Sequence, residues 1–158
     1  MAVIGQILNT WAEKRRTELI EKLHSMGKGK SGNFEKNTNV RNPSEYVTQI
    51  WVPDYTYYLV NGRLPNKNQT PEGLKKWVGW AGNTFLKKWV EENGINISPF
   101  AVAYKIARVG WQIPNAHNDG TLVSSVFTQS KIDDLKTEIG QNYIMDLKSE
   151  IIRIWQQQ

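Results

Sequence analysis

The sequence predicts an α+β fold, in which a small antiparallel β-sheet is flanked by long N- and C-terminal helices and two or three shorter helices. Apolar residues recur at three- and four-residue spacing near both ends of the chain, which indicates two long amphipathic helices. Residues 46–52 alternate in side-chain type and are rich in β-branched and aromatic residues, which favours a strand. The 158 residues, 18.2 kDa in mass, are expected to form a single domain, 1–158.

The N-terminal helix is expected over residues 3–25 and is about 35 Å long at 1.5 Å per residue. Glycines that follow Met26 end it. Residues 27–45 show no periodicity and are rich in Gly, Asn, Lys and Ser, so a loop is predicted there. The apolar stripe of the helix consists of Ile4, Ile7, Leu8, Trp11, Leu19, Ile20 and Leu23.

Residues 46–128 are expected to contain the sheet and the inserted helices. Pro53 ends the first strand-like segment, because proline cannot donate to a strand ladder. Residues 55–60 fit either a short second strand or one turn of helix. Residues 122–127 form a short apolar run that fits a strand or the entry to the last helix.

Two sequence signals of the same type predict the inserted helices. Thr70 and Ser98 are capping hydroxyl residues, and each is followed by a proline at the first helical position. The first helix extends to Val90, but glycines and an asparagine at 79–83 weaken its middle, so it is expected to bend or divide. The second helix ends at Gly110.

The C-terminal helix is expected over residues 130–157. Ser130 and Asp133 resemble a capping box at its start. At 1.5 Å per residue, the helix is about 39 Å long. Its apolar stripe consists of Ile132, Leu135, Ile139, Tyr143, Leu147, Ile151 and Trp155.

Composition excludes several classes of chemistry. The chain has no cysteine, so disulfides, thiolate zinc sites, iron–sulfur clusters and cysteine nucleophiles are ruled out. No cationic segment precedes an apolar stretch at the N-terminus, and no apolar run approaches the roughly 20 residues that cross a bilayer. We therefore expect neither a signal peptide nor a membrane partner, and a reducing cytoplasm as the place of synthesis.

The net charge of +5 is spread unevenly along the chain. Residues 1–45 carry 8 basic and 5 acidic side chains, residues 46–111 carry 8 and 4, and residues 112–158 carry 4 and 6. A pI of about 9.4 is a recognised cue for nucleic-acid binding. The densest basic region supplies candidate DNA-channel residues, namely Lys14, Arg15, Arg16, Lys28, Lys30 and Lys36. A solvated helix face, or contact with the acidic third of a neighbouring copy, explains the same pattern.

Motifs for catalysis or metal binding are weak. The Gly27–Ser31 segment lacks the earlier glycine that a phosphate-binding loop requires, since that position is His24. His24 and His117 stand alone, without zinc-ligand spacing, and His24 fits a cation at a helix C-terminus. Glu18 and Glu21 share a helix face, which is typical of solvated carboxylates. The chain is expected not to be an enzyme and to have no cofactor.

The middle of the chain carries a resemblance to a known family. An aromatic pair, Tyr57-Tyr58, precedes Asn61-Gly62-Arg63-Leu64-Pro65, and a helix bearing Trp77 follows. Then comes Ser98-Pro99-Phe100-Ala101-Val102-Ala103-Tyr104-Lys105-Ile106-Ala107-Arg108-Val109-Gly110-Trp111. This order resembles the neck and tail-completion proteins of tailed bacteriophages, small head–tail connector and minor tail components. The Trp-rich extension over 79–90 and the long C-terminal helix depart from the family pattern.

The resemblance implies a structural virion protein that forms a closed ring in the phage neck or tail. Such a ring, twelvefold or sixfold, joins the portal or adaptor to tail proteins around a DNA channel, after assembly in the host cytoplasm. Trp and Tyr are enriched at protein interfaces, although about half of the tryptophans are expected to fill the core. The candidate interface residues are Trp11, Trp51, Tyr57, Tyr58, Arg63, Trp77, Trp80, Trp89, Trp111 and Trp155.

The alternative is a sequence-nonspecific DNA-binding protein that uses the basic Lys14–Lys36 region. Such binding is dominated by phosphate contacts and weakens steeply with salt. A ring whose basic residues line a DNA channel combines both interpretations, because phosphate contacts carry no sequence information.

Overall fold

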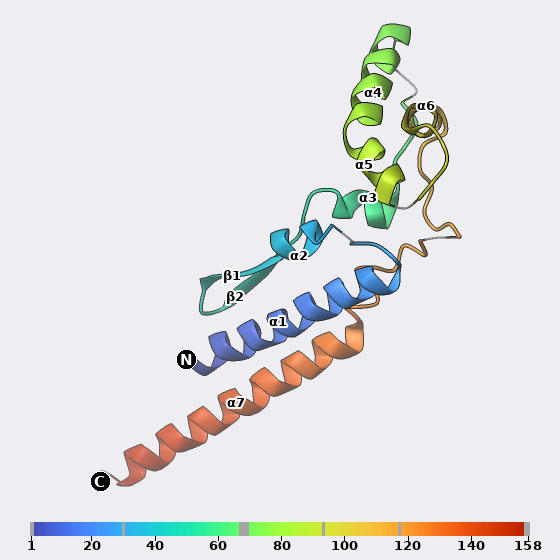
Figure 1. The fold of residues 1–158 in the computed structure, drawn as a ribbon. Helices are drawn as coiled ribbons and strands as arrows, with labels where there is room; N and C mark the ends of the chain where they lie inside the picture. The colour runs from blue at the N-terminus through green and yellow to red at the C-terminus, as the bar shows by residue number, and fades with distance from the viewer. Residues whose placement is uncertain (1, 30, 67–69, 93, 117, 157–158) are drawn as a thin grey trace. The chain divides into compact units, whose positions relative to one another are not determined.

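The structure is a computed structural model that describes residues 2–29, 31–66, 70–92, 94–116 and 118–156 (Figure 1). The sequence predicts one domain, and within it the structure divides into two compact units. The terminal unit comprises Met1–Thr56 and Thr121–Gln158, and the central unit comprises Tyr57–Gly120.

The terminal unit pairs two long helices with a β-hairpin. It contains α1 (Ala2–Ser25), α2 (Asn33–Asn37), β1 (Asn39–Ser44), β2 (Val47–Trp51) and α7 (Gln129–Gln156). Both strands pack against α1, and α7 runs beside α1 with the N- and C-termini at the same end (Figure 1). The strands are antiparallel, and their register shifts between Arg41 and Ser44. Pro43 lies in this irregular stretch, as expected of a residue without a backbone N–H.

The prediction of a loop over residues 27–45 is wrong for its later part, because those residues form α2 and β1. Phe34 has 0% exposure and anchors α2 in the core, where the buried Thr38 hydroxyl donates to the Phe34 carbonyl (2.6 Å). The β1 sequence, NVRNPS, is largely polar. It forms a strand because β2 pairs with it and α1 packs against it, which outweighs its weak intrinsic propensity.

Buried apolar side chains from α1, α2 and the segment before α7 form the core of the terminal unit. They are Ile7, Ala12, Leu19, Leu23, Phe34, Leu122 and Val126. The apolar run 122–127 therefore contributes to the core, although it forms turns rather than the expected strand or helix entry. Helix α7 begins at Gln129, and the hydroxyl of Thr128, not that of Ser130, accepts from the Lys131 amide (3.5 Å).

The central unit is helical and contains α4 (Pro71–Asn83), α5 (Phe85–Glu92) and α6 (Pro99–Val109), with α3 (Thr56–Asn61) leading into it. Residues 56–61 thus adopt the helical alternative. The Thr70 hydroxyl caps α4 by accepting from the Gly73 amide (3.2 Å), as predicted. The expected division of the Trp-bearing helix falls at Thr84.

Close packing of α4 against α6 forms the core of the central unit. Ala81, Leu86 and Ala103 are buried there, and Trp77, Val78, Val102 and Ile106 pack around them. A Cβ atom at Gly82 would lie 2.5 Å from the Phe100 ring, so glycine at this position permits the close approach. The α+β class is confirmed, with the small antiparallel sheet and the long terminal helices that the sequence predicts.

None of the helices within the described residues is long and apolar enough to cross a membrane.

Candidate assembly surfaces

Two motifs far apart in sequence meet in the central unit. The Arg63 amide donates to the Trp111 carbonyl, and the Trp111 amide donates to the Arg63 carbonyl, both at 2.7 Å. Gly62 adopts a φ of +73°, and a Cβ atom there would lie 2.1 Å from the Trp111 carbonyl oxygen. Gly110 has a φ of +81°, and a Cβ atom there would lie 2.4 Å from the Arg63 carbonyl oxygen. Only glycine fits either position, which accounts physically for the Gly-Arg pair and for the Gly-Trp pair that faces it.

The Arg63 side chain reinforces the same junction. Its guanidinium lies 4.1 Å from the centre of the Trp77 ring and donates to the Asn66 side-chain oxygen (3.0 Å). Arg63, Trp77 and Trp111 are half-buried. Three predicted interface residues are therefore parts of the internal framework of the central unit.

Other predicted aromatic residues are exposed on the central unit. Tyr57 and Trp80 have exposed fractions of 65% and 59%, and Tyr58 and Trp89 are also exposed. Trp80 contacts the exposed Phe85 ring edge-on, with centroids 5.6 Å apart. Large exposed aromatic rings of this kind are typical of surfaces that partners cover.

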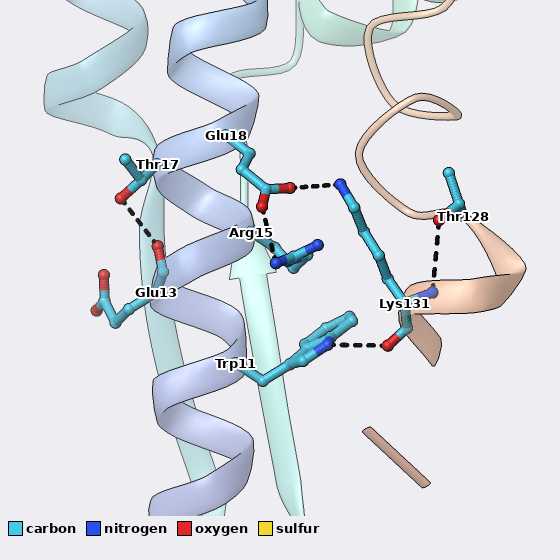
Figure 2. A network of polar contacts seen from close by, with 7 residues as sticks. All are labelled: Trp11, Glu13, Arg15, Thr17, Glu18, Thr128 and Lys131. Carbon is cyan, nitrogen blue, oxygen red and sulfur yellow. Dashed lines mark hydrogen bonds and ion pairs between the residues drawn. The ribbon is translucent and has the colours of Figure 1, made fainter. Parts of the chain in front are cut away.

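In the terminal unit, Trp11 joins α1 to α7 (Figure 2). Its indole N–H donates to the Lys131 carbonyl (3.2 Å), and its ring meets Phe127 edge-on at 6.0 Å. Trp11 is half-buried and belongs to this junction, whereas Trp51 is exposed on β2 beneath the Arg41 guanidinium, 4.4 Å from the ring centre.

An ionic chain continues the Trp11 junction (Figure 2). Glu18 accepts from Arg15 (2.8 Å) through one carboxylate oxygen and from Lys131 (2.6 Å) through the other. Arg15 has an exposed fraction of only 4%, and its Nε and Nη1 atoms have no hydrogen-bond partner. Glu18 is therefore more than the solvated carboxylate that its helix position predicts, because both of its oxygens are paired, although its side chain is 26% exposed.

The predicted DNA-channel residues do not form one exposed surface. Arg15 is buried, which corrects its assignment to a channel. Arg16 donates to the carbonyls of Thr38 (2.6 Å) and Glu35 (3.3 Å) and so connects α1 to the α2–β1 segment. Burial lowers the pKa of the half-buried Lys28. Only Lys14 and Lys36 are exposed among the described members, and Lys30 lies outside the described residues.

An apolar groove opens in the terminal unit between α1, β2 and the start of α7. Its volume is about 480 Å³. The groove is lined by Leu8, Trp11, Ala12, Tyr46, Val47, Thr48, Ile50, Phe127 and Leu135. Sequence reasoning missed it, because its walls come from three segments whose pairing is set by the tertiary fold.

The second half of α7 exposes apolar side chains, and Tyr143, Leu147 and Ile151 among them belong to the predicted apolar stripe of the helix. Tyr143, Ile144, Met145, Leu147, Ile151 and Ile152 are all close to half exposed, between 46% and 57%. Trp155 lies in α7, but its side chain is outside the described residues. The periodicity of this segment predicts a buried apolar face, but the terminal unit leaves that face exposed.

The two histidines give no catalytic arrangement within the part of the chain that is described. His24 contacts the Glu35 carboxylate (2.8 Å), next to the end of α1. His117 lies outside the described residues. No group of three or more potential metal-ligating side chains occurs among the residues that the structure describes.

Comparison of the chain with protein-family models, curated proteins and solved structures finds no match.

Proposed function

We propose that this chain is a structural virion protein, a subunit of a closed homo-oligomeric ring in the neck or tail connector of a tailed bacteriophage. In the proposed ring, subunits surround the DNA channel between the portal or adaptor and tail proteins. The observation that carries the proposal is the large apolar surface left exposed on each compact unit.

Each compact unit exposes large apolar side chains. In the terminal unit, Tyr143, Leu147 and Ile151 have exposed fractions between 46% and 55%. In the central unit, Tyr57 and Trp80 have exposed fractions of 65% and 59%. Exposed apolar side chains in such number are typical of surfaces that other proteins cover.

The motif pattern adds to this support. The residues that resemble neck and tail-completion proteins, Gly62-Arg63 and Gly110-Trp111, meet at one backbone junction in the central unit. Their spacing in the sequence therefore reflects a framework that positions the exposed aromatic side chains of α3 and α4.

Contact with DNA is a subsidiary part of the proposal. Lys14 and Lys36 are the exposed members of the basic set among the described residues. Two exposed cations fit nonspecific phosphate contact better than a dedicated DNA-binding face. The buried Arg15 and the internally bonded Arg16 weaken the case for a DNA-binding protein that acts through this region alone.

Mass photometry of the purified chain tests the proposal. A closed ring gives one dominant mass at an integral multiple of the subunit mass, because a closing heterologous interface fixes the copy number. The same mass should persist over a tenfold dilution. A chain that stays monomeric, both alone and when mixed with portal and tail proteins, would overturn the proposed function.

A further inference from the structure

We propose that the exposed distal half of α7, residues 141–156, docks into the apolar groove of the terminal unit of a second copy of this chain. The inference rests on the proposed function and identifies the contact that links neighbouring subunits. It requires that the distal half of α7 is uncovered in one chain, that the groove has room for it, and that the two cannot meet within the same chain.

The length of α1 explains why the distal half of α7 is uncovered. Trp11 lies opposite Lys131, and the two helices run side by side in opposite directions (Figure 1). From Trp11 to the start of α1 at Ala2 is about 14 Å, and α7 covers the same distance by Gly140. Residues 141–156, about 24 Å of helix, therefore extend past the start of α1.

Side-chain exposure changes at the same point. Ile132, Leu135 and Ile139 are half-buried beside α1, whereas Tyr143 and Leu147 are exposed. In proteins, most of the stability of a helix comes from tertiary packing of its apolar face. The apolar content of this segment indicates that its stable environment is a protein surface.

The groove matches this segment in length and chemistry. Tyr143, Leu147 and Ile151 recur every four residues on one face and span about 12 Å of helix. The β2 wall of the groove, Val47 to Ile50, spans about 10 Å of strand, close to the length of this apolar face. Both surfaces are predominantly apolar, so their contact removes apolar area from water on both sides.

A second copy is the occupant because the segment cannot reach the groove of its own chain. Leu135 already lines that groove, and Leu147 lies about 18 Å further along the same continuous helix. Each chain thus offers one groove and one distal α7 at different places on its surface. A contact of this heterologous type generates a ring when the rotation closes.

Cysteine cross-linking tests the contact directly, since the natural chain has no cysteine and gives no background. Val47→Cys marks the groove, and Leu147→Cys marks the distal half of α7. A mixture of the two single variants should give a covalent dimer under mild oxidation. The matched control is Ser149→Cys, which lies about 160° around the helix from Leu147 and should give no dimer with Val47→Cys.

The double variant Val47→Cys/Leu147→Cys should give a covalent ladder that stops at the copy number of the ring. An intramolecular disulfide in this variant, a Leu147-to-Leu147 disulfide, or a native oligomer without any Val47-to-Leu147 cross-link would overturn the inference. In the last two cases an oligomer still exists, so the proposed function survives. Absence of any oligomer overturns the proposed function as well.

A charge substitution gives a second, independent readout. Leu147→Asp should raise the subunit dissociation constant by about 30-fold or more, as expected when a buried apolar interface anchor is lost. Ser149→Asp should leave the dissociation constant unchanged. Circular dichroism should show the same helix content in both variants, because both positions are exposed in the single chain. Equal assembly of the two variants would overturn the inference.

Discussion

Replacement of Glu18 by glutamine tests the ionic junction between α1 and α7. Glu18 is the carboxylate paired with the buried Arg15 guanidinium, whose Nη2 lies 2.8 Å from it. Glutamine keeps the size of the side chain but leaves Arg15 without a counter-charge, and its Nε and Nη1 atoms already have no hydrogen-bond partner. Glu18→Gln therefore isolates the cost of an uncompensated buried cation.

The magnitude follows from burial. Removal of one partner from a buried ion pair typically costs about 3–5 kcal/mol. The Glu18 side chain is 26% exposed, so water screens part of the interaction, and we expect a loss of about 3 kcal/mol in the free energy of unfolding. With a denaturant slope of about 2 kcal/mol per molar urea, the midpoint should fall by about 1.5 M.

Two lysine variants provide the comparison. Lys131→Met leaves the Arg15–Glu18 pair intact, and the Lys131 carbonyl still accepts from Trp11, so the loss should be about 1 kcal/mol or less. Lys136→Met removes an exposed pair with Asp133 and should not shift the midpoint measurably. The double variant Arg15→Leu/Glu18→Leu should be more stable than Glu18→Gln, because it removes both buried charges.

Urea titrations followed by circular dichroism, all at one protein concentration, measure these midpoints. The expected order of destabilisation is Glu18→Gln, then Lys131→Met, then Lys136→Met. A Glu18→Gln midpoint no lower than that of Lys131→Met would refute the reasoning, since it would mean that Arg15 does not depend on the Glu18 carboxylate.

Three further predictions concern the framework, the alkaline pH range and DNA. Gly62→Ala should destabilise the central unit by about 3 kcal/mol or more, because its Cβ would clash with the Trp111 carbonyl. Gly27 has a similar positive φ but open space where a Cβ would lie, so Gly27→Ala should cost only about 1 kcal/mol. Thermal or urea unfolding measures both losses. Burial raises the pKa of Tyr55 above 10.0, so its contribution to stability is present below pH 10 and is lost as the pH rises through the raised value. Stability measured from pH 9 to 11 should therefore fall less steeply in Tyr55→Phe than in the natural chain. The DNA prediction concerns Lys14 and Lys36. If they contact phosphates, Lys14→Gln and Lys36→Gln should each reduce the slope of log affinity for duplex DNA against log salt concentration by about 1 in magnitude. Unchanged slopes would exclude these contacts.

The sequence was sufficient for elements whose signals are local. The long terminal helices follow from apolar periodicity, and the start of α4 follows from Thr70 and Pro71. The strand β2 follows from alternating side chains. These signals depend on neighbours within a few residues, so a single sequence contains them.

Elements that depend on distant partners could not be predicted in this way. The β1 residues are polar and form a strand through pairing with β2, and Phe34 gives a single apolar signal within a polar segment. Burial of Arg15 was hidden because Arg15 and Glu18, three residues apart on a helix, have the same spacing as a solvated pair. The α7 segment that contributes Lys131 distinguishes this pair from a solvated one, and that segment is distant in sequence.

The candidate surfaces also combine features that local sequence predicts with features that depend on distant partners. Aromatic content predicted interface residues, but it did not separate the exposed Trp80 from Trp77, which packs against Arg63. The groove required the tertiary arrangement of α1, β2 and α7, and so did the finding that α7 extends past α1.

Cryo-electron microscopy of the purified recombinant chain tests the central claim most directly. The proposed function predicts closed rings of a single rotational order. The further inference adds that the distal half of each α7 is seated against the terminal unit of the next subunit. Particles that are only monomers, or open filaments without a closed ring, would contradict the claim that this chain is a ring subunit.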